Sequence, residues 1–136
     1  MWPDGRVPGS PQDWLDRAKS DLALAGISLP EGAFLEDLCF HAQQAAEKAL
    51  KAVYVGNGWS FRYTHDIGEL LTGLQDRGID IPSSVDESVI LASFAWEARY
   101  PGPGEPVSEE EYLMALEYAA GVVGWAENEI KLNKAE

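Results

Sequence analysis

The chain has 136 residues, a hydrophobic content of 46% and a formal net charge of −13. This length suits one domain with a single core, and the hydrophobic content with five tryptophans excludes a disordered acidic tail. The net charge predicts repulsion of nucleic acid at long range. It therefore weighs against a broad RNA- or DNA-binding surface, but it leaves room for one local basic pocket.

The cysteine content and the apolar runs indicate where the protein resides. Cys39 is the only cysteine, so no internal disulfide can form, and only His41 lies near it at a spacing that zinc could use. The longest apolar run, residues 89–96, is far shorter than the roughly 20 residues that span a bilayer. The N-terminus lacks the apolar stretch of a secretory signal. We therefore expect a cytoplasmic protein without membrane association, metal or other cofactor.

The N-terminal part of the chain predicts a flexible segment and two helices. Residues 1–12 are polar and rich in proline and glycine, and a single domain is expected over 13–132. The first helix is predicted over 13–27 and the second over 32–55, where Gly56 or Gly58 would end it. Their inward positions follow helical spacing: Trp14, Ala18, Leu22 and Ala25 in the first, and Leu35, Leu38, Ala42, Ala46, Ala49 and Val53 in the second.

Three more helices are predicted from capping signals. One begins at residues 64–66, one at the capping box of Ser84 and Glu87, and one at that of Ser108 and Glu111. The fourth is expected to reach about residue 99 and the fifth about residue 132. Their expected inward residues are Ile67, Leu70, Leu71 and Leu74, then Val85, Val89, Ala92 and Trp96, then Leu113, Leu116, Ala120 and Val123. No segment reads as a strand, so the fold class is all-α, an up-and-down bundle of four to five helices.

A basic stretch stands out within this acidic chain. Residues 38–65 hold three of the ten lysines and arginines and both histidines, with Glu47 as the one acid. Lys51 follows Glu47 at the i,i+4 spacing of a helix-surface ion pair, which is worth a few tenths of a kcal/mol.

One edge of the second helix collects polar groups from this stretch. His41, Gln44 and Lys48 have i, i+3, i+7 spacing, so they share a helix face. A cation, an amide donor and an imidazole suit an anionic ligand such as a phosphate or a nucleotide. A solvated helix face is the alternative, in which His41 is a structural histidine.

Two further segments carry candidate ligand-binding residues. In "FRYTHDI", His65 lies where a helix begins and backbone N–H groups could bind an anion, unless Asp66 caps that helix and His65 stacks on Tyr63. In "WEARYPGPG", Arg99 ends a helix, where a cation suits the dipole, and Tyr100 precedes a proline. The alternative is an arginine cap followed by a packed tyrosine.

Enzyme signatures are weak in this chain. It holds no glycine-rich phosphate loop, no HExxH and no GxSxG, and its two histidines form no triad that a sequence can show.

Taken in order, three motifs resemble the HEPN domain family over nearly the whole chain. They are "CFHAQQAAEKALKAV", "THDIGELL" and "ARYPG", the last before a capped final helix. The resemblance implies an all-α bundle that commonly forms homodimers. It also implies a possible small nucleotidyltransferase partner, sometimes as a toxin–antitoxin pair, and binding of nucleotides. Some members are metal-independent ribonucleases, with an arginine, four to six residues, then a histidine.

The chain departs from this ribonuclease motif. Arg62 precedes His65 by too short a gap, and no histidine follows Arg99. A ribonuclease that uses His65 and Arg99 is therefore the second hypothesis, and the leaning is toward no enzyme. The first is a dimeric binding module that takes a nucleotide or RNA phosphate, or acts with a nucleotidyltransferase. Its predicted site residues are His41, Gln44, Lys48, Lys51, Arg62, His65, Arg99 and Tyr100.

A third hypothesis gives the polar residues of the second helix a structural role only. They would form a buried, fully paired network, and Gln44→Ala would then destabilise the fold by about 1–3 kcal/mol.

Overall fold

The computed structural model describes residues 5–95 and 106–135. Within these ranges the chain forms helices and no strand, which confirms the all-α class. The elements are α1 (Pro11–Ala25), α2 (Leu35–Gly56), α3 (Ile67–Asp76), α4 (Ser83–Asp86), the 3₁₀ helix η1 (Glu87–Ala95) and α5 (Glu109–Ala135).

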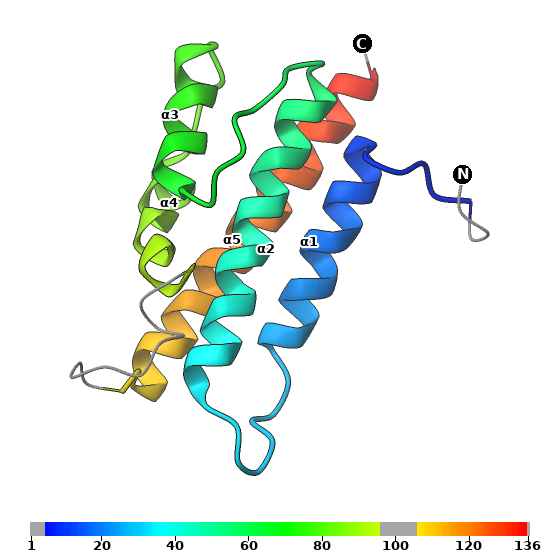
Figure 1. Cartoon of the computed structure of the whole chain (residues 1–136). Helices are drawn as coiled ribbons and strands as arrows, with labels where there is room; N and C mark the ends of the chain where they lie inside the picture. The colour runs from blue at the N-terminus through cyan, green and yellow to red at the C-terminus, as the bar shows by residue number, and fades with distance from the viewer. Residues whose placement is uncertain (1–4, 96–105, 136) are drawn as a thin grey trace.

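Helix α2 is the centre of the bundle. In Figure 1 it lies between α1 on one side and α3 with α4 on the other, and α5 runs behind it. Its core positions are small, which lets α1 and α5 approach its backbone closely. Five of its alanines are completely buried: Ala42, Ala45, Ala46, Ala49 and Ala52.

Several helix ends form as their sequences predict. Ser108 Oγ accepts from Glu111 N at 3.1 Å, and Glu111 Oε1 accepts from Ser108 N at 3.1 Å, which confirms this capping box. After α2, Gly58 has φ +75°, and Trp59 N donates to Tyr54 O at 2.9 Å. This is a Schellman end, which needs a residue that tolerates positive φ. Helix α1 begins at Pro11, ahead of the predicted start, because Ser10 Oγ caps Asp13 N.

The predicted fourth helix is only partly correct. The α-helical part is Ser83–Asp86, with Pro82 at its N-cap, and no capping box forms at Ser84. A 3₁₀ helix follows, in which Ser88 Oγ donates to Val85 O at 2.5 Å. Such hydroxyl bonds to the carbonyl three residues earlier compete with α-helical bonding and suit the tighter i→i+3 winding. The new winding leaves Val89, predicted to be inward, 47% exposed.

The inward face of α5 is rotated from the predicted one, although Val123 is buried as predicted and Leu116 packs against the core. Leu113 is 54% exposed, whereas Tyr112 is buried and its hydroxyl donates to Ala25 O at 2.5 Å. An aromatic ring buries more apolar area than a leucine, and this one also satisfies a carbonyl at the end of α1. Tyr112 therefore sets the register, and Ala115, Ala119, Val122 and Ala126 follow it into the core.

Candidate functional site

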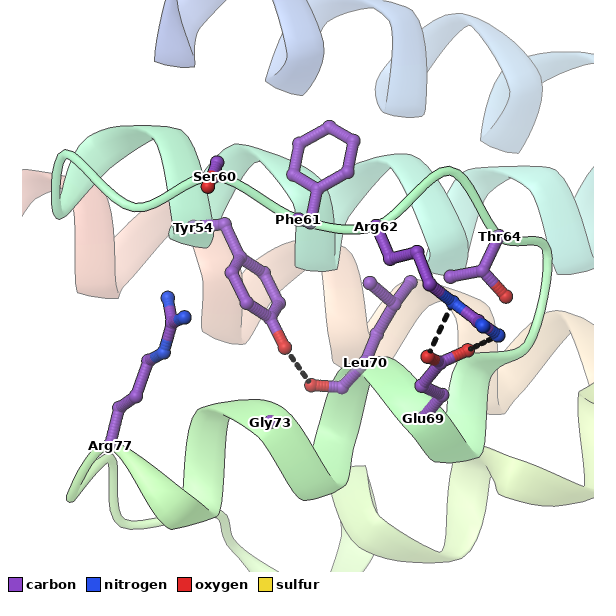
Figure 2. A pocket seen from close by; sticks show the side chains of 9 residues that line it. All are labelled: Tyr54, Ser60, Phe61, Arg62, Thr64, Glu69, Leu70, Gly73 and Arg77. Carbon is purple, nitrogen blue, oxygen red and sulfur yellow. Dashed lines mark hydrogen bonds and ion pairs between the residues drawn. The ribbon is translucent and has the colours of Figure 1, made fainter.

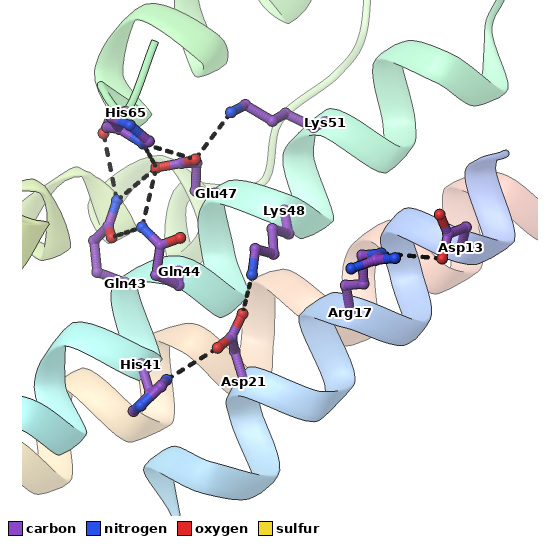
Figure 3. Close-up of polar contacts among 10 residues, drawn as sticks. All are labelled: Asp13, Arg17, Asp21, His41, Gln43, Gln44, Glu47, Lys48, Lys51 and His65. Carbon is purple, nitrogen blue, oxygen red and sulfur yellow. Dashed lines mark hydrogen bonds and ion pairs between the residues drawn. The ribbon is translucent and has the colours of Figure 1, made fainter. Parts of the chain in front are cut away.

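A carboxylate, a lysine and a histidine meet between α1 and α2. Asp21 lies 3.0 Å from His41 Nδ1 and accepts from Lys48 Nζ at 2.6 Å (Figure 3). His41 and Lys48 share the i, i+7 spacing that places both beside α1. These side chains stay partly open, with 34% of His41 and 26% of Lys48 exposed. We refer to these three residues as the Asp21 cluster.

A second carboxylate, lysine and histidine meet between α2 and the loop that leads to α3. Glu47 accepts from Lys51 Nζ at 2.9 Å and lies 3.1 Å from His65 Nδ1. Gln43 Nε2 donates to Glu47 at 3.0 Å and to the His65 carbonyl at 3.3 Å. Gln44 Nε2 donates to Gln43 Oε1 at 2.7 Å. These five residues form the Glu47 cluster (Figure 3).

Most of the Glu47 cluster is buried. Gln43 is 0% exposed, Glu47 2% and Lys51 4%. Buried polar groups are stable only when they are paired, and each of these three has a partner within the cluster. The amides and charges in the middle of α2 therefore attach the α2–α3 loop to the helix.

Aromatic rings enclose the Lys51 ammonium. Nζ lies 5.3 Å from the ring centre of Phe61, 5.7 Å from that of Trp14 and 5.8 Å from that of Tyr63. Trp14 comes from α1, and the other two rings come from the α2–α3 loop. The interpretation of Lys51 with Glu47 as a surface ion pair is therefore wrong, because the loop folds back over α2 and covers it.

The exposed part of the α2–α3 loop presents polar and aromatic groups. Tyr63 is 84% exposed, and the side chains of Arg62 and His65 are 77% and 54% exposed. The start of α3 is closed by Asp66, whose Oδ1 accepts from Glu69 N at 3.3 Å. Of the two interpretations of this segment, the structure confirms the aspartate cap, while the His65 and Tyr63 rings meet edge-on rather than stacked.

In the folded structure, carboxylates neutralise the positive charges of residues 38–65. Each lysine or arginine of residues 38–65 pairs with a carboxylate, and two of the three carboxylates come from α1 and α3. The pairs are Lys48 with Asp21, Lys51 with Glu47 and Arg62 with Glu69. An anionic ligand at this face must therefore compete with carboxylates that the linear sequence places elsewhere.

A cleft of about 440 Å³ opens between the N-terminal segment, α1 and α2. Of the predicted site residues, Lys48 lines it, together with Trp14 and Arg17 of α1. The sequence does not single out Trp14 or Arg17 as site residues, because helical periodicity places Trp14 on the inward face of the first helix. Their i, i+3 spacing, a helix neighbour pair of aromatic ring and cation, was the signal available. The remaining lining residues are Pro8, Gly9 and Asp13.

Asp13 fixes one wall of this cleft. Its carboxylate accepts from Gly9 N at 2.9 Å and from Arg17 Nε at 3.1 Å, and Arg6 lies 4.0 Å away. The Gly9 hydrogen bond, followed by the Arg17 and Arg6 charges, holds the pKa of this carboxyl below its usual 3.8 although burial opposes the shift. Asp13 therefore stays ionised and connects the N-terminal segment to α1.

Thiol and metal chemistry find no support among the described residues. Burial raises the pKa of the Cys39 thiol to about 11, so it is protonated and unreactive at neutral pH. No three His, Cys, Asp or Glu side chains in the described ranges come together as metal ligands. In the same ranges, no helix combines the length and apolar character needed to cross a membrane.

The structure distributes the predicted site residues among separate places. His41 and Lys48 lie together, and Gln44, Lys51 and His65 lie in the Glu47 cluster. Arg62 lies apart, against α3. Arg99 and Tyr100 lie outside the described residues.

Comparison with known proteins gives a consistent result. The HEPN domain model matches residues 11–130. The crystal structure of TT1696 from Thermus thermophilus is 31% identical with a TM-score of 0.78, and the match covers 89% of this chain and 98% of that one. The crystal structure of ST0689, an archaeal HEPN homologue, is 26% identical with a TM-score of 0.71 and the same coverages. Among curated proteins, none matches the chain.

Proposed function

The chain belongs to the HEPN domain family, and we propose that it acts as a nucleotide-binding module whose site is the cleft between α1 and α2. The observation that carries this proposal is the combination of Trp14, Arg17 and Lys48 around one cleft. Its volume of about 440 Å³ falls in the range of roughly 300–1,000 Å³ that is typical of small-ligand sites.

Trp14 supplies the surface for a base. Its ring is half-buried and meets Phe61 edge-on at 5.7 Å, which fixes its orientation. Aromatic rings stack on nucleobases of any kind, at about 1–3 kcal/mol for each base. A site of this kind would hold a base without reading its identity through hydrogen bonds.

Arg17 and Lys48 supply the charges for phosphates. The Arg17 side chain is 47% exposed beside Asp13, and that of Lys48 is 26% exposed beside Asp21. Ion pairs open to solvent contribute only about 0–1 kcal/mol. A phosphate can therefore take part in these pairs at little cost to the fold, whereas the buried Lys51 ammonium stays with Glu47.

Titration with ATP and GTP, with and without magnesium, tests this proposal through tryptophan fluorescence and calorimetry. We expect saturable binding that is weakened at least about tenfold by the double change Arg17→Gln, Lys48→Gln, because two hydrogen bonds between charged groups are lost. Lys19→Gln is the matched control, since Lys19 lies on α1 but pairs with Glu127. Unchanged affinity in the double variant would remove the cleft from consideration.

A metal-independent ribonuclease is the second candidate, and one contact favours it. Glu47 holds His65 through Nδ1 at 3.1 Å, and the imidazole is 54% exposed. A carboxylate that orients a histidine is a recurring arrangement for proton transfer. RNA cleavage without added metal should then disappear in His65→Ala and Arg99→Ala. Cleavage that survives both changes would come from another site or another protein.

The homodimer and the nucleotidyltransferase partner are further proposals. The exposed apolar side chains of Leu113, Met114 and Leu132 on α5 support a protein contact on that helix. Light scattering of the purified chain tests the homodimer. A pull-down with a small nucleotidyltransferase tests the second partner. A monomer that captures no such protein would contradict both.

A further inference from the structure

A small pocket lies on the other side of the α2–α3 loop, against α3. Its volume is about 160 Å³, and Figure 2 shows its residues between the loop and the helix. Arg62 and Arg77 line it at opposite ends, and Ser60 and Thr64 are among its other lining residues. The other lining residues are Tyr54, Phe61, Glu69, Leu70 and Gly73.

Arg77 is held in place by aromatic rings rather than by an acid. Its guanidinium carbon lies 5.2 Å from the ring centre of Trp59 and 5.6 Å from that of Tyr54. Within residues 5–95 and 106–135, no carboxylate forms an ion pair with it. A guanidinium stacked on a ring keeps its N–H donors in its own plane, where they can bind an oxyanion.

Arg62 reaches the pocket from the loop. Its Nε lies 2.9 Å from Glu69 Oε1 and its Nη2 donates to Glu69 Oε2 at 3.0 Å. A guanidinium has five N–H donors, and this pair leaves others unused. The pair is exposed and adds little stability. Glu69 thus orients Arg62, and both carboxylate oxygens of Glu69 contact the Arg62 guanidinium.

We propose that this pocket binds one phosphate-sized oxyanion, with Arg77 as the principal donor and Arg62 as the second. The two guanidiniums outnumber the one carboxylate in a chain whose net charge is −13. The volume of about 160 Å³ is below the roughly 300 Å³ that a drug-sized ligand requires. A single phosphate group, free or at the end of a larger molecule, is the ligand that this size and these donors fit.

The floor of the pocket supports the same assignment. Tyr54 Oη donates to Leu70 O at 2.7 Å, directly beside Gly73. A Cβ at position 73 would overlap this hydroxyl, so α3 can approach α2 this closely only with glycine there. The close approach brings Arg77, the residue that follows α3, to the rings of Tyr54 in α2 and Trp59 just beyond it.

The test follows the Arg62 and Arg77 side-chain Nε–H signals by NMR during titration with inorganic phosphate at constant ionic strength. We expect both signals to shift saturably in the wild-type chain. In Arg77→Gln, which removes the charge from an exposed side chain, phosphate affinity should fall at least about tenfold. Arg77→Lys keeps the charge but loses the planar donors, so it should restore only part of the affinity.

Lys19→Gln is the matched control, because Lys19 pairs with Glu127 and is not among the lining residues of either pocket. It should leave the phosphate affinity reported by the Arg62 and Arg77 signals within about twofold. Phenyl phosphate tests the source of the anion: binding equal to that of inorganic phosphate indicates a group on a larger molecule, and weaker binding indicates the free ion. Shifts that do not saturate, or that persist in Arg77→Gln, would overturn the assignment.

Discussion

The same three chemical groups meet twice beside helix α2, with different degrees of burial. Glu47, Lys51 and His65 form one set of carboxylate, lysine and histidine, and Asp21, Lys48 and His41 form the other. The Glu47 and Lys51 side chains are 3% and 5% exposed, against 11% for Asp21 and 26% for Lys48. Burial rather than residue type therefore separates the two sets: the Glu47–Lys51 pair is enclosed in the fold, whereas Lys48 of the second set keeps part of its side chain exposed.

Removing the buried carboxylate should give the largest effect. Glu47→Ala leaves the Lys51 ammonium inside the protein without its partner, so the free energy of unfolding should fall by about 3–5 kcal/mol. Urea denaturation followed by circular dichroism measures this. Asp21→Ala is the matched change in the open cluster and should cost far less. Equal losses in the two variants would contradict the comparison.

A smaller loss is expected from the amide that supports the buried cluster. Gln43→Ala removes the donor to Glu47 and to the His65 carbonyl, and we expect a loss of about 1–3 kcal/mol. Gln44→Ala should lie at the low end of that range, because Gln44 is only half-buried. The same denaturation experiment ranks the two. A larger loss of stability in Gln44→Ala than in Gln43→Ala would show that Gln44, and not Gln43, is the main support of the Glu47 cluster.

Neutralising Asp21 should cost less stability than removing Glu47, since its partners His41 and Lys48 keep 34% and 26% of their side chains exposed. Asp21→Asn removes the charge that compensates Lys48, so affinity for ATP in the cleft should rise while the fold is unchanged. Calorimetry measures this affinity, and Glu127→Gln, which releases Lys19 instead, is the control. Unchanged affinity for ATP would mean that Lys48 does not contact the ligand.

The smallest effect concerns Asp13, which lines the cleft beside the open cluster. Its pKa is lowered in the folded chain, so its stabilising contribution is fully present above its usual pKa of 3.8 and disappears as the pH falls through the lowered value. Asp13→Asn should therefore flatten the pH dependence of stability at and below pH 3.8. Thermal unfolding measured at a series of pH values reports this. An unchanged profile would mean that other carboxyls produce the acid loss.

Local signals in the sequence predicted the helices and several of their ends. The capping box of Ser108 and Glu111 and the cap at Asp66 join residues three apart in the chain, so a short window of sequence is enough to suggest them. The burial of Lys51 could not be predicted, because it depends on a loop folding back over its own helix. The compensation of Lys48 by Asp21 joins residues 27 apart, and no window along the chain shows it.

The errors in the predicted inward faces of η1 and α5 have a related cause. Helical periodicity treats all apolar residues alike, so it cannot show that Tyr112 rather than Leu113 enters the core to satisfy the Ala25 carbonyl. The same periodicity cannot separate an α-helix from the 3₁₀ winding of η1, which depends on hydroxyls that bond to the backbone.

Gly73 fixes the spacing between α2 and α3. The gap between α3 and α2 is set by the absence of one carbon atom at this position, because that absence admits the Tyr54 hydroxyl. The methyl group added in Gly73→Ala would push α3 away from α2 beside the pocket that Arg62 and Arg77 line. One hydrogen atom in place of a methyl group therefore sets the distance between two helices and the width of the recess that they share.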